Sequence, residues 1–152
     1  MTLTTEQRRK IGLSNRRKGL AFEHKVRADL EKSGYIVSKW QNNIKFEEFS
    51  TPDNKYGGVG IHGKLCPAHP GHFRLMQTGF PDFVAFIKIE NITTNGQILY
   101  NVIGVECKSN GYVDKEEREK CKWYLEHKIF SKILIASKGE KRGEIVYKEF
   151  EE

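Results

Sequence analysis

Two short stretches of the sequence decide the fold: Gly79-Phe80-Pro81-Asp82-Phe83-Val84-Ala85-Phe86 and Val105-Glu106-Cys107-Lys108. The first opens an apolar run over 83–89, and the second closes another apolar run over 99–108. The residues between these runs, at 91–97, have the polar composition of a turn. The pattern therefore predicts two strands joined as a hairpin.

Three ionisable side chains lie at the ends of these expected strands. Residues two apart in a strand point to the same face, so Glu106 and Lys108 project together while Cys107 points towards the core. Asp82 opens the neighbouring strand, so the three side chains are expected to converge at one edge of the sheet. Charges at the end of an apolar strand are costly to bury unless they are paired or bind a metal ion.

The residues alone leave two interpretations of this cluster open. Carboxylates beside a lysine suit Mg²⁺, which can activate water and stabilise charge on a phosphodiester. The alternative is a structural salt bridge between Lys108 and one of the acids, because ion-pair networks also gather such groups.

Regular patterns on both sides of the hairpin complete an α/β domain. Phe22, Val26 and Leu30 recur at helical spacing, which predicts a helix from Gly19 that stops at Gly34. The other expected elements are a strand at 35–37, a helix at 115–128 with Asp114 as N-cap, and strands at 133–136 and 144–148. Their order indicates a single α/β domain with a central mixed β-sheet flanked by helices.

Residues 41–79 break this regularity. They hold three prolines and six glycines with little periodicity, which predicts a long irregular loop. We therefore expect a domain over 18–152 with an insertion at about 41–79. The preceding residues, 1–17, would form either a mobile arm or a short leading helix.

Positive charge is concentrated at one end of the chain. The net charge is +6, and residues 1–20 hold six basic residues against one acid, a net +5. A polyanion such as DNA is the natural partner of such an end, although a solvated terminus has the same composition. The candidate DNA-binding residues are Arg8, Arg9, Lys10, Arg16, Arg17 and Lys18.

Composition argues against membrane and secreted classes. No window approaches the ~18 apolar residues of a membrane span, and the first residues lack the apolar core of a signal peptide. The three cysteines are an odd number and widely spaced, which favours a reducing compartment. The expected location is intracellular, in the cytoplasm or nucleoid, or in a host cell if the chain is viral.

Two further motifs in the segment 58–72 have weaker support. Gly58 to Leu65 fits glycine-rich phosphate-binding patterns, but the sequence around it predicts neither a preceding strand nor a following helix. Nitrogen and sulfur ligands for zinc are also present, although ligands this close in sequence would strain a tetrahedral site. These candidate zinc ligands are His62, Cys66, His69 and His72. A polar loop is the competing interpretation of both motifs.

The two stretches quoted first resemble the PD-(D/E)XK nuclease superfamily, which has the restriction-endonuclease-like fold. Lys18-Gly19-Leu20-Ala21-Phe22-Glu23, followed by an amphipathic helix, is similar to the opening of archaeal Holliday junction resolvases. The loop, helix and strand after Lys108 follow the same pattern, so the resemblance covers about 18–40 and 79–136. The stretch from His72 to Asp82 is also similar to virus-type replication-repair nucleases.

The resemblance implies a metal-dependent endodeoxyribonuclease that hydrolyses DNA phosphodiester bonds with Mg²⁺, or with Mn²⁺ as a substitute. Asp82 and Glu106 would bind the metal together with the backbone carbonyl of Cys107. Glu23 would bind it directly or through water, and Lys108 would position the attacking water. These roles make Glu23, Asp82, Glu106 and Lys108 the expected catalytic residues.

The substrate of such a nuclease stays open. A four-way junction would require a homodimer, because two symmetric cuts need two sites. The long insertion leaves a nuclease of linear duplex DNA in restriction, repair or viral genome processing as an alternative. A non-catalytic DNA-binding protein that keeps the fold is a further alternative.

Overall fold

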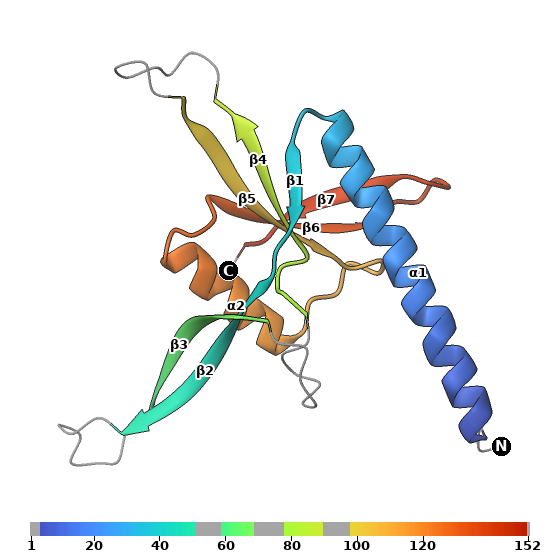
Figure 1. The fold of residues 1–152 in the computed structure, drawn as a ribbon, viewed down its shortest axis with the longest axis horizontal. Helices are drawn as coiled ribbons and strands as arrows, with labels where there is room; N and C mark the ends of the chain where they lie inside the picture. The colour runs from blue at the N-terminus through green and yellow to red at the C-terminus, as the bar shows by residue number, and fades with distance from the viewer. Residues whose placement is uncertain (1–3, 51–58, 69–77, 90–97, 152) are drawn as a thin grey trace.

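The computed structural model describes residues 4–50, 59–68, 78–89 and 98–151, and it confirms the α/β class. Within these residues, two helices and seven strands follow one another along the chain (Figure 1). Their bounds are α1 Thr5–Lys32, β1 Ile36–Lys39, β2 Asn42–Ser50, β3 Val59–Pro67, β4 Phe83–Lys88, β5 Tyr100–Cys107, α2 Lys115–Glu126, β6 Lys132–Lys138 and β7 Ile145–Glu149. The expected turn at 91–97 lies outside the described residues.

Five of the described strands form a mixed sheet in the order β1-β4-β5-β6-β7. β4 is antiparallel to both β1 and β5, β5 is parallel to β6, and β7 is antiparallel to β6. The predicted hairpin is confirmed as β4 and β5, with Phe83 opposite Val105. α2 connects the parallel strands β5 and β6, because a parallel pair needs a long crossover.

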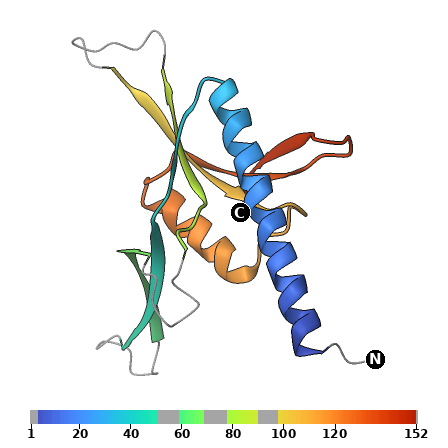
Figure 2. The same cartoon turned by 45° about the vertical axis from the view of Figure 1, so that its right-hand side comes forward.

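Alternation along the strands divides the core into two halves. Phe83 and Val105 pack in one cluster with Val26 of α1. Val84, the next residue of β4, packs in the other cluster with Tyr124 of α2. The two helices therefore cover opposite faces of the sheet (Figure 2).

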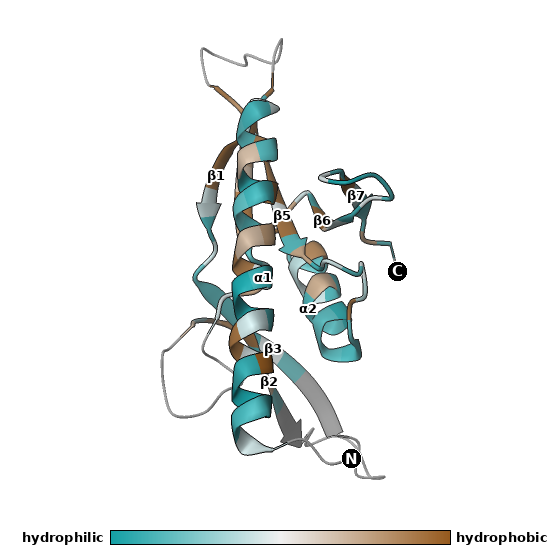
Figure 3. Cartoon of the chain, turned by 90° about the vertical axis from the view of Figure 1, so that its right-hand side faces the viewer, coloured by the Kyte–Doolittle hydropathy of each residue, from teal (hydrophilic) through white to brown (hydrophobic). Residues whose placement is uncertain are grey.

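α1 begins with a capping box and ends at the predicted glycine. The Thr4 hydroxyl accepts a hydrogen bond from the Gln7 N–H at 3.2 Å, and the Thr4 N–H donates to Gln7 Oε1 at 2.9 Å. Ser33 caps the other end, and Gly34 follows with φ of +89°, a left-handed conformation that favours glycine. Residues 5–17 are thus the first part of the same helix, whose buried residues lie in its second half. Figure 3 shows this first part extending past the sheet as a mostly hydrophilic helix.

The prediction of an irregular loop over 41–79 was wrong for much of that segment. β2 and β3 form an antiparallel two-stranded sheet in which Asn42 pairs with Pro67 and Ser50 with Val59. The glycine content concealed the strands, but Gly63 has a packing role: a Cβ there would lie 2.4 Å from Trp123 Nε1. Residues 51–58 and 69–77 lie outside the described part.

The second helix and the remaining strands match the sequence pattern. Asp114 is the N-cap of α2, as predicted, and its carboxylate accepts a hydrogen bond from the Glu117 N–H at 2.9 Å.

Neither of the helices in the described part of the chain has the length and apolar character that crossing a membrane requires.

Among the described glycines, Gly79 leaves the least room for a Cβ, and its replacement should weaken the fold. A Cβ on Gly79 would lie 1.8 Å from the carbonyl oxygen of Trp40, so the backbone would have to move. We expect Gly79→Ala to lower the free energy of unfolding by about 1–3 kcal/mol in urea denaturation. Gly12→Ala is the matched control, because a Cβ at this position in the first half of α1 would meet nothing within 4 Å. The control should raise the free energy of unfolding by about 1 kcal/mol. Equal changes in the free energy of unfolding of both variants would contradict the requirement for glycine at position 79.

Candidate active site

Asp82 and Glu106 are each hydrogen-bonded to the other's strand at the end of the β4–β5 hairpin. The register that pairs Phe83 with Val105 brings Asp82 opposite Glu106. The Asp82 N–H donates to Glu106 Oε2 at 3.0 Å, and the Cys107 N–H donates to Asp82 Oδ2 at 3.0 Å. The side chain of Asp82 is 20% exposed and that of Glu106 is 8% exposed. The two carboxylates are therefore fixed in place and largely shielded from water.

Glu23 and Lys39 border this carboxylate pair on the side of α1. Lys39, the last residue of β1, donates a hydrogen bond to Glu23 Oε2. Its Nζ also lies 3.6 Å from Asp82 Oδ1 and 4.6 Å from the centre of the Phe83 ring. The ammonium group thus lies between a carboxylate of the helix and a carboxylate of the sheet.

Lys108 and Glu117 border the pair on the side of α2. Lys108 Nζ lies 3.3 Å from Glu106 Oε1 and donates a hydrogen bond to Glu117 Oε1. The other oxygen of Glu117 accepts a hydrogen bond from the Asp114 N–H at 3.1 Å, as part of the capping box of α2. The beginning of α2 therefore fixes the position of the lysine.

Burial and mutual repulsion make the two acids reluctant to ionise. Burial raises the pKa of Glu106 to about 8, and the charge of Asp82 adds to this effect. Burial also raises the pKa of Asp82, although the hydrogen bond from Cys107 opposes the shift. A cation bound at these oxygens would favour the charged forms and so lower both pKa values.

The two lysines, unlike the two acids, favour their charged forms. Burial alone would lower the pKa of Lys108, but its hydrogen bond to Glu117 and the charge of Glu106 outweigh burial, and the pKa lies above its usual value. The pKa of Lys39 is raised in the same way, since its bond to Glu23 and the charge of Asp82 outweigh burial. Both lysines therefore remain ammonium groups at neutral pH.

The structure brings together the four side chains that the sequence assigned to the site: Glu23, Asp82, Glu106 and Lys108. It adds Lys39 and Glu117, which the sequence analysis did not assign to the site. The capping-box pattern Asp114-x-x-Glu117 was a local signal for the second of these. No local signal marks Lys39, because its place depends on the pairing of β1 with β4, where it lies opposite Phe83.

The candidate zinc ligands are not assembled in the described part of the chain. His62 and Cys66 lie four residues apart on β3, where they pair with Glu47 and Asn43 of β2. His69 and His72 lie outside the described residues. The glycine-rich pattern at 58–65 falls largely on β3 as well, so its described residues form a strand and not the loop that phosphate binding needs.

The six candidate DNA-binding residues are all exposed on the first half of α1. Lys10 forms an ion pair with Glu6 at 2.9 Å, one helical turn away. The other five are exposed along the same half of the helix.

Comparison of the chain with protein-family models, with curated proteins and with solved structures finds no match.

The donor chemistry at the hairpin end fits a hard divalent cation. Mg²⁺ takes one or two carboxylates and keeps several waters, and Asp82, Glu106 and the Cys107 carbonyl are oxygen donors of this kind. Within the described ranges, no three His, Cys, Asp or Glu side chains are arranged to hold a metal. Glu23 is engaged by Lys39, so the fit rests on the Asp82–Glu106 pair.

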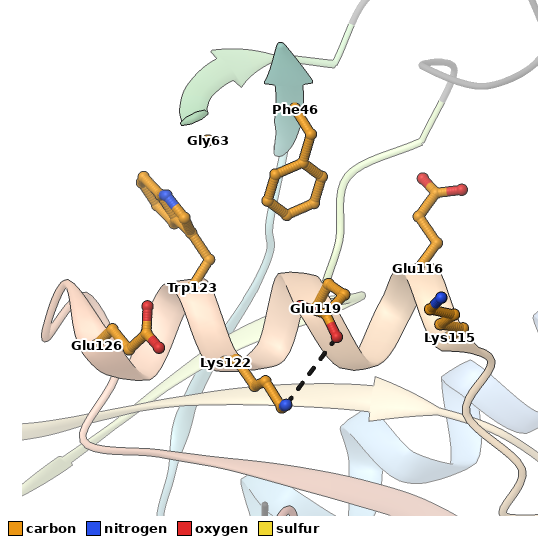
Figure 4. Close-up of a pocket in the computed structure, with 8 residues that line it drawn as sticks. All are labelled: Phe46, Gly63, Lys115, Glu116, Glu119, Lys122, Trp123 and Glu126. Atoms are coloured by element: carbon orange, nitrogen blue, oxygen red, sulfur yellow. Dashed lines mark ion pairs between the residues drawn. The ribbon is translucent and has the colours of Figure 1, made fainter. Parts of the chain in front are cut away.

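Two hollows lie near these elements, and one of them borders the site. A groove of about 550 Å³ is lined by Glu23, Lys39 and Asp82 together with neighbouring residues of α1. The other, of about 600 Å³, lies between α2 and the β2–β3 hairpin, with Phe46 and Trp123 among its lining residues (Figure 4). Two of its acids, Glu116 and Glu119, pair with lysines of α2 at 2.7 and 4.0 Å.

The position of Lys39 predicts how the site responds to divalent ions. Lys39→Met leaves Glu23 and Asp82 without their shared counter-charge, and we expect a loss of about 1 kcal/mol in EDTA, because solvent screens a half-exposed lysine. Mg²⁺ at millimolar concentration should restore part of this loss, since an ion that binds the folded state stabilises it. Urea denaturation with and without Mg²⁺ measures both effects.

Lys45→Met is the matched control for this experiment. Lys45 pairs with Glu47 on the exposed face of β2, at 2.7 Å, away from the carboxylate pair. Its replacement should leave the response to Mg²⁺ at the wild-type value. An identical Mg²⁺ response of Lys39→Met, Lys45→Met and the wild type would show that Lys39 does not share the cation site.

Proposed function

We propose that this chain is a metal-dependent endodeoxyribonuclease that hydrolyses phosphodiester bonds of DNA. The observation that carries the proposal is the buried Asp82–Glu106 pair with Lys108 at 3.3 Å from Glu106. Burial and the charge of Asp82 disfavour ionisation of Glu106, and a divalent cation bound at these oxygens would offset that cost. The exposed basic half of α1 next to this site supports a polyanionic substrate.

The roles of the residues follow from their contacts. A divalent ion bound by Asp82, Glu106 and the Cys107 carbonyl would supply Lewis acidity for the phosphodiester and its attacking water. Lys108 remains protonated, so it orients the water and stabilises negative charge as a hydrogen-bond donor and does not act as a base. Glu117 is a positioning residue that holds the lysine towards the site.

The order of elements supports the same proposal. The helix with Glu23 comes first, and after β1 and the β2–β3 hairpin comes the β4–β5 hairpin, whose end holds Asp82, Glu106 and Lys108. A helix and a buried strand follow. This is the order that the resemblance to PD-(D/E)XK nucleases implies. A four-way junction and a linear duplex are both substrates consistent with these elements. Symmetric cleavage of a junction would need a homodimer. The proposed location of the enzyme is intracellular.

A cleavage assay with Mg²⁺ tests the proposal. Wild type and Lys108→Ala are incubated with a labelled four-way junction and with a linear duplex of matched sequence. We expect the wild type to cut at least one substrate, with EDTA abolishing the cut. Lys108→Ala should cut at least about 100-fold more slowly, because a preorganised donor at the reacting group has this order of effect.

A matched lysine on the same sheet gives the control. Lys132 begins β6 and forms an ion pair with Glu149 at 3.8 Å. It lies four residues before Ala136, which pairs with Cys107. Lys132→Ala should retain wild-type cleavage. Binding of both DNAs without cleavage of either, across Mg²⁺ and Mn²⁺, would instead support a non-catalytic DNA-binding protein.

A further inference from the structure

A groove next to the carboxylate pair extends the site along α1. It lies between this helix and the chain segments that follow β1 and precede β4. Its lining includes Glu23 and Asp82 of the site and, further towards the beginning of α1, Arg16 and Gly19. The groove therefore joins the candidate reacting groups to the basic half of the helix.

Helix geometry explains why these residues share the groove. Arg16, Gly19 and Glu23 are spaced three and four residues apart, so they lie on one face of α1. Seven residues of helix place Arg16 about 10 Å from Glu23 along the axis. Along the axis of a DNA duplex this distance corresponds to about three base-pair steps.

No packing contact within the described part of the chain explains why residue 19 is a glycine. Glycine in the middle of a helix is destabilising relative to alanine. A Cβ on Gly19 would meet nothing within 4 Å, so no internal packing contact requires its absence. A glycine in the wall of a groove leaves room for close approach of a ligand to the helix backbone.

Arg16 is the cation of this groove that has no acidic partner among the described residues. Lys39, the other lysine or arginine in the lining, is paired with Glu23 and Asp82. The guanidinium group of Arg16 is exposed on the helix and can bind a phosphate through two parallel hydrogen bonds. The groove thus combines an unpaired arginine with a place where a backbone can come close.

We propose that this groove is a subsite for the backbone of the DNA strand that reaches the carboxylate pair. Arg16 binds a phosphate of this strand on the side of the reacting phosphate that lies towards the beginning of α1, and the strand passes over Gly19. This inference rests on the proposed function for the identity of its ligand. It distinguishes Arg16 from the other basic residues of α1, which would contact DNA only through their charge.

The first test compares two adjacent arginines. Arg16→Gln and Arg17→Gln remove the same charge from the same exposed helix, but Arg17 does not line the groove. Dissociation constants for a labelled duplex and a labelled four-way junction are measured in EDTA by fluorescence anisotropy, from about 50 to 200 mM salt. We expect Arg16→Gln to weaken binding at least about tenfold, as loss of a specific charged pair does, and Arg17→Gln about twofold. Equal losses would overturn the subsite.

The second test uses two glycines of the same helix face. Gly19→Ala and Gly12→Ala should both raise the melting temperature, by about 2–4 °C, because alanine favours the helix. Gly19→Ala should nevertheless weaken DNA binding at least about fivefold, since its methyl group would occupy the space of the strand. Gly12→Ala, which lies outside the groove lining, should bind as the wild type does. Wild-type binding by Gly19→Ala would overturn the passage of the strand over this residue.

The readout is binding in EDTA, so it separates this inference from the proposed nuclease activity. Selective loss in Arg16→Gln and Gly19→Ala, without cleavage by the wild type in Mg²⁺ or Mn²⁺, would support the subsite and overturn the nuclease. Cleavage by the wild type, together with equal losses of DNA binding in both arginine variants, would support the nuclease and overturn the subsite. A wild type that binds neither DNA would overturn both.

Discussion

The candidate site depends on two reciprocal hydrogen bonds between the ends of β4 and β5. Each carboxylate accepts the backbone N–H of the opposite strand: Glu106 from Asp82, and Asp82 from Cys107. Buried backbone donors at the end of a ladder must find acceptors, and these two acids provide them. The hairpin therefore cannot complete its hydrogen bonding without also bringing the two acids together. Structure and candidate chemistry are consequences of the same contacts.

The charges around this pair come from both faces of the sheet. Lys39 approaches from the side of α1 and Lys108 from the side of α2, and each is bound to a further carboxylate, Glu23 or Glu117. Lys108 is held by a helix cap, which fixes it more firmly than an exposed ion pair would. The neighbouring Cys107 donates its backbone N–H to Asp82, and burial raises the pKa of its thiol well above the usual value.

Local signals predicted the hairpin, the N-cap of α2 and the buried face of α1, because each depends on residues close in sequence. The sequence did not reveal β2 and β3, since Gly63 looks like a strand breaker until Trp123, far along the chain, occupies the space beside it. Lys39 was missed for the same reason, as its partners come from α1 and β4. The Thr4 and Gln7 capping box was a local signal for an early helix start that the charge pattern obscured.

The first half of α1 connects the two proposals. Residues 5–20 are exposed along their whole length, so this half gains little stability from packing. It holds six basic side chains, which repel one another, and only one acid. The ion pair between Glu6 and Lys10 offsets only part of that repulsion. A polyanion along this half would relieve the repulsion and favour the helical form. Because Glu23 lies on the same continuous helix, DNA that stabilises the basic half would also stabilise one wall of the carboxylate site.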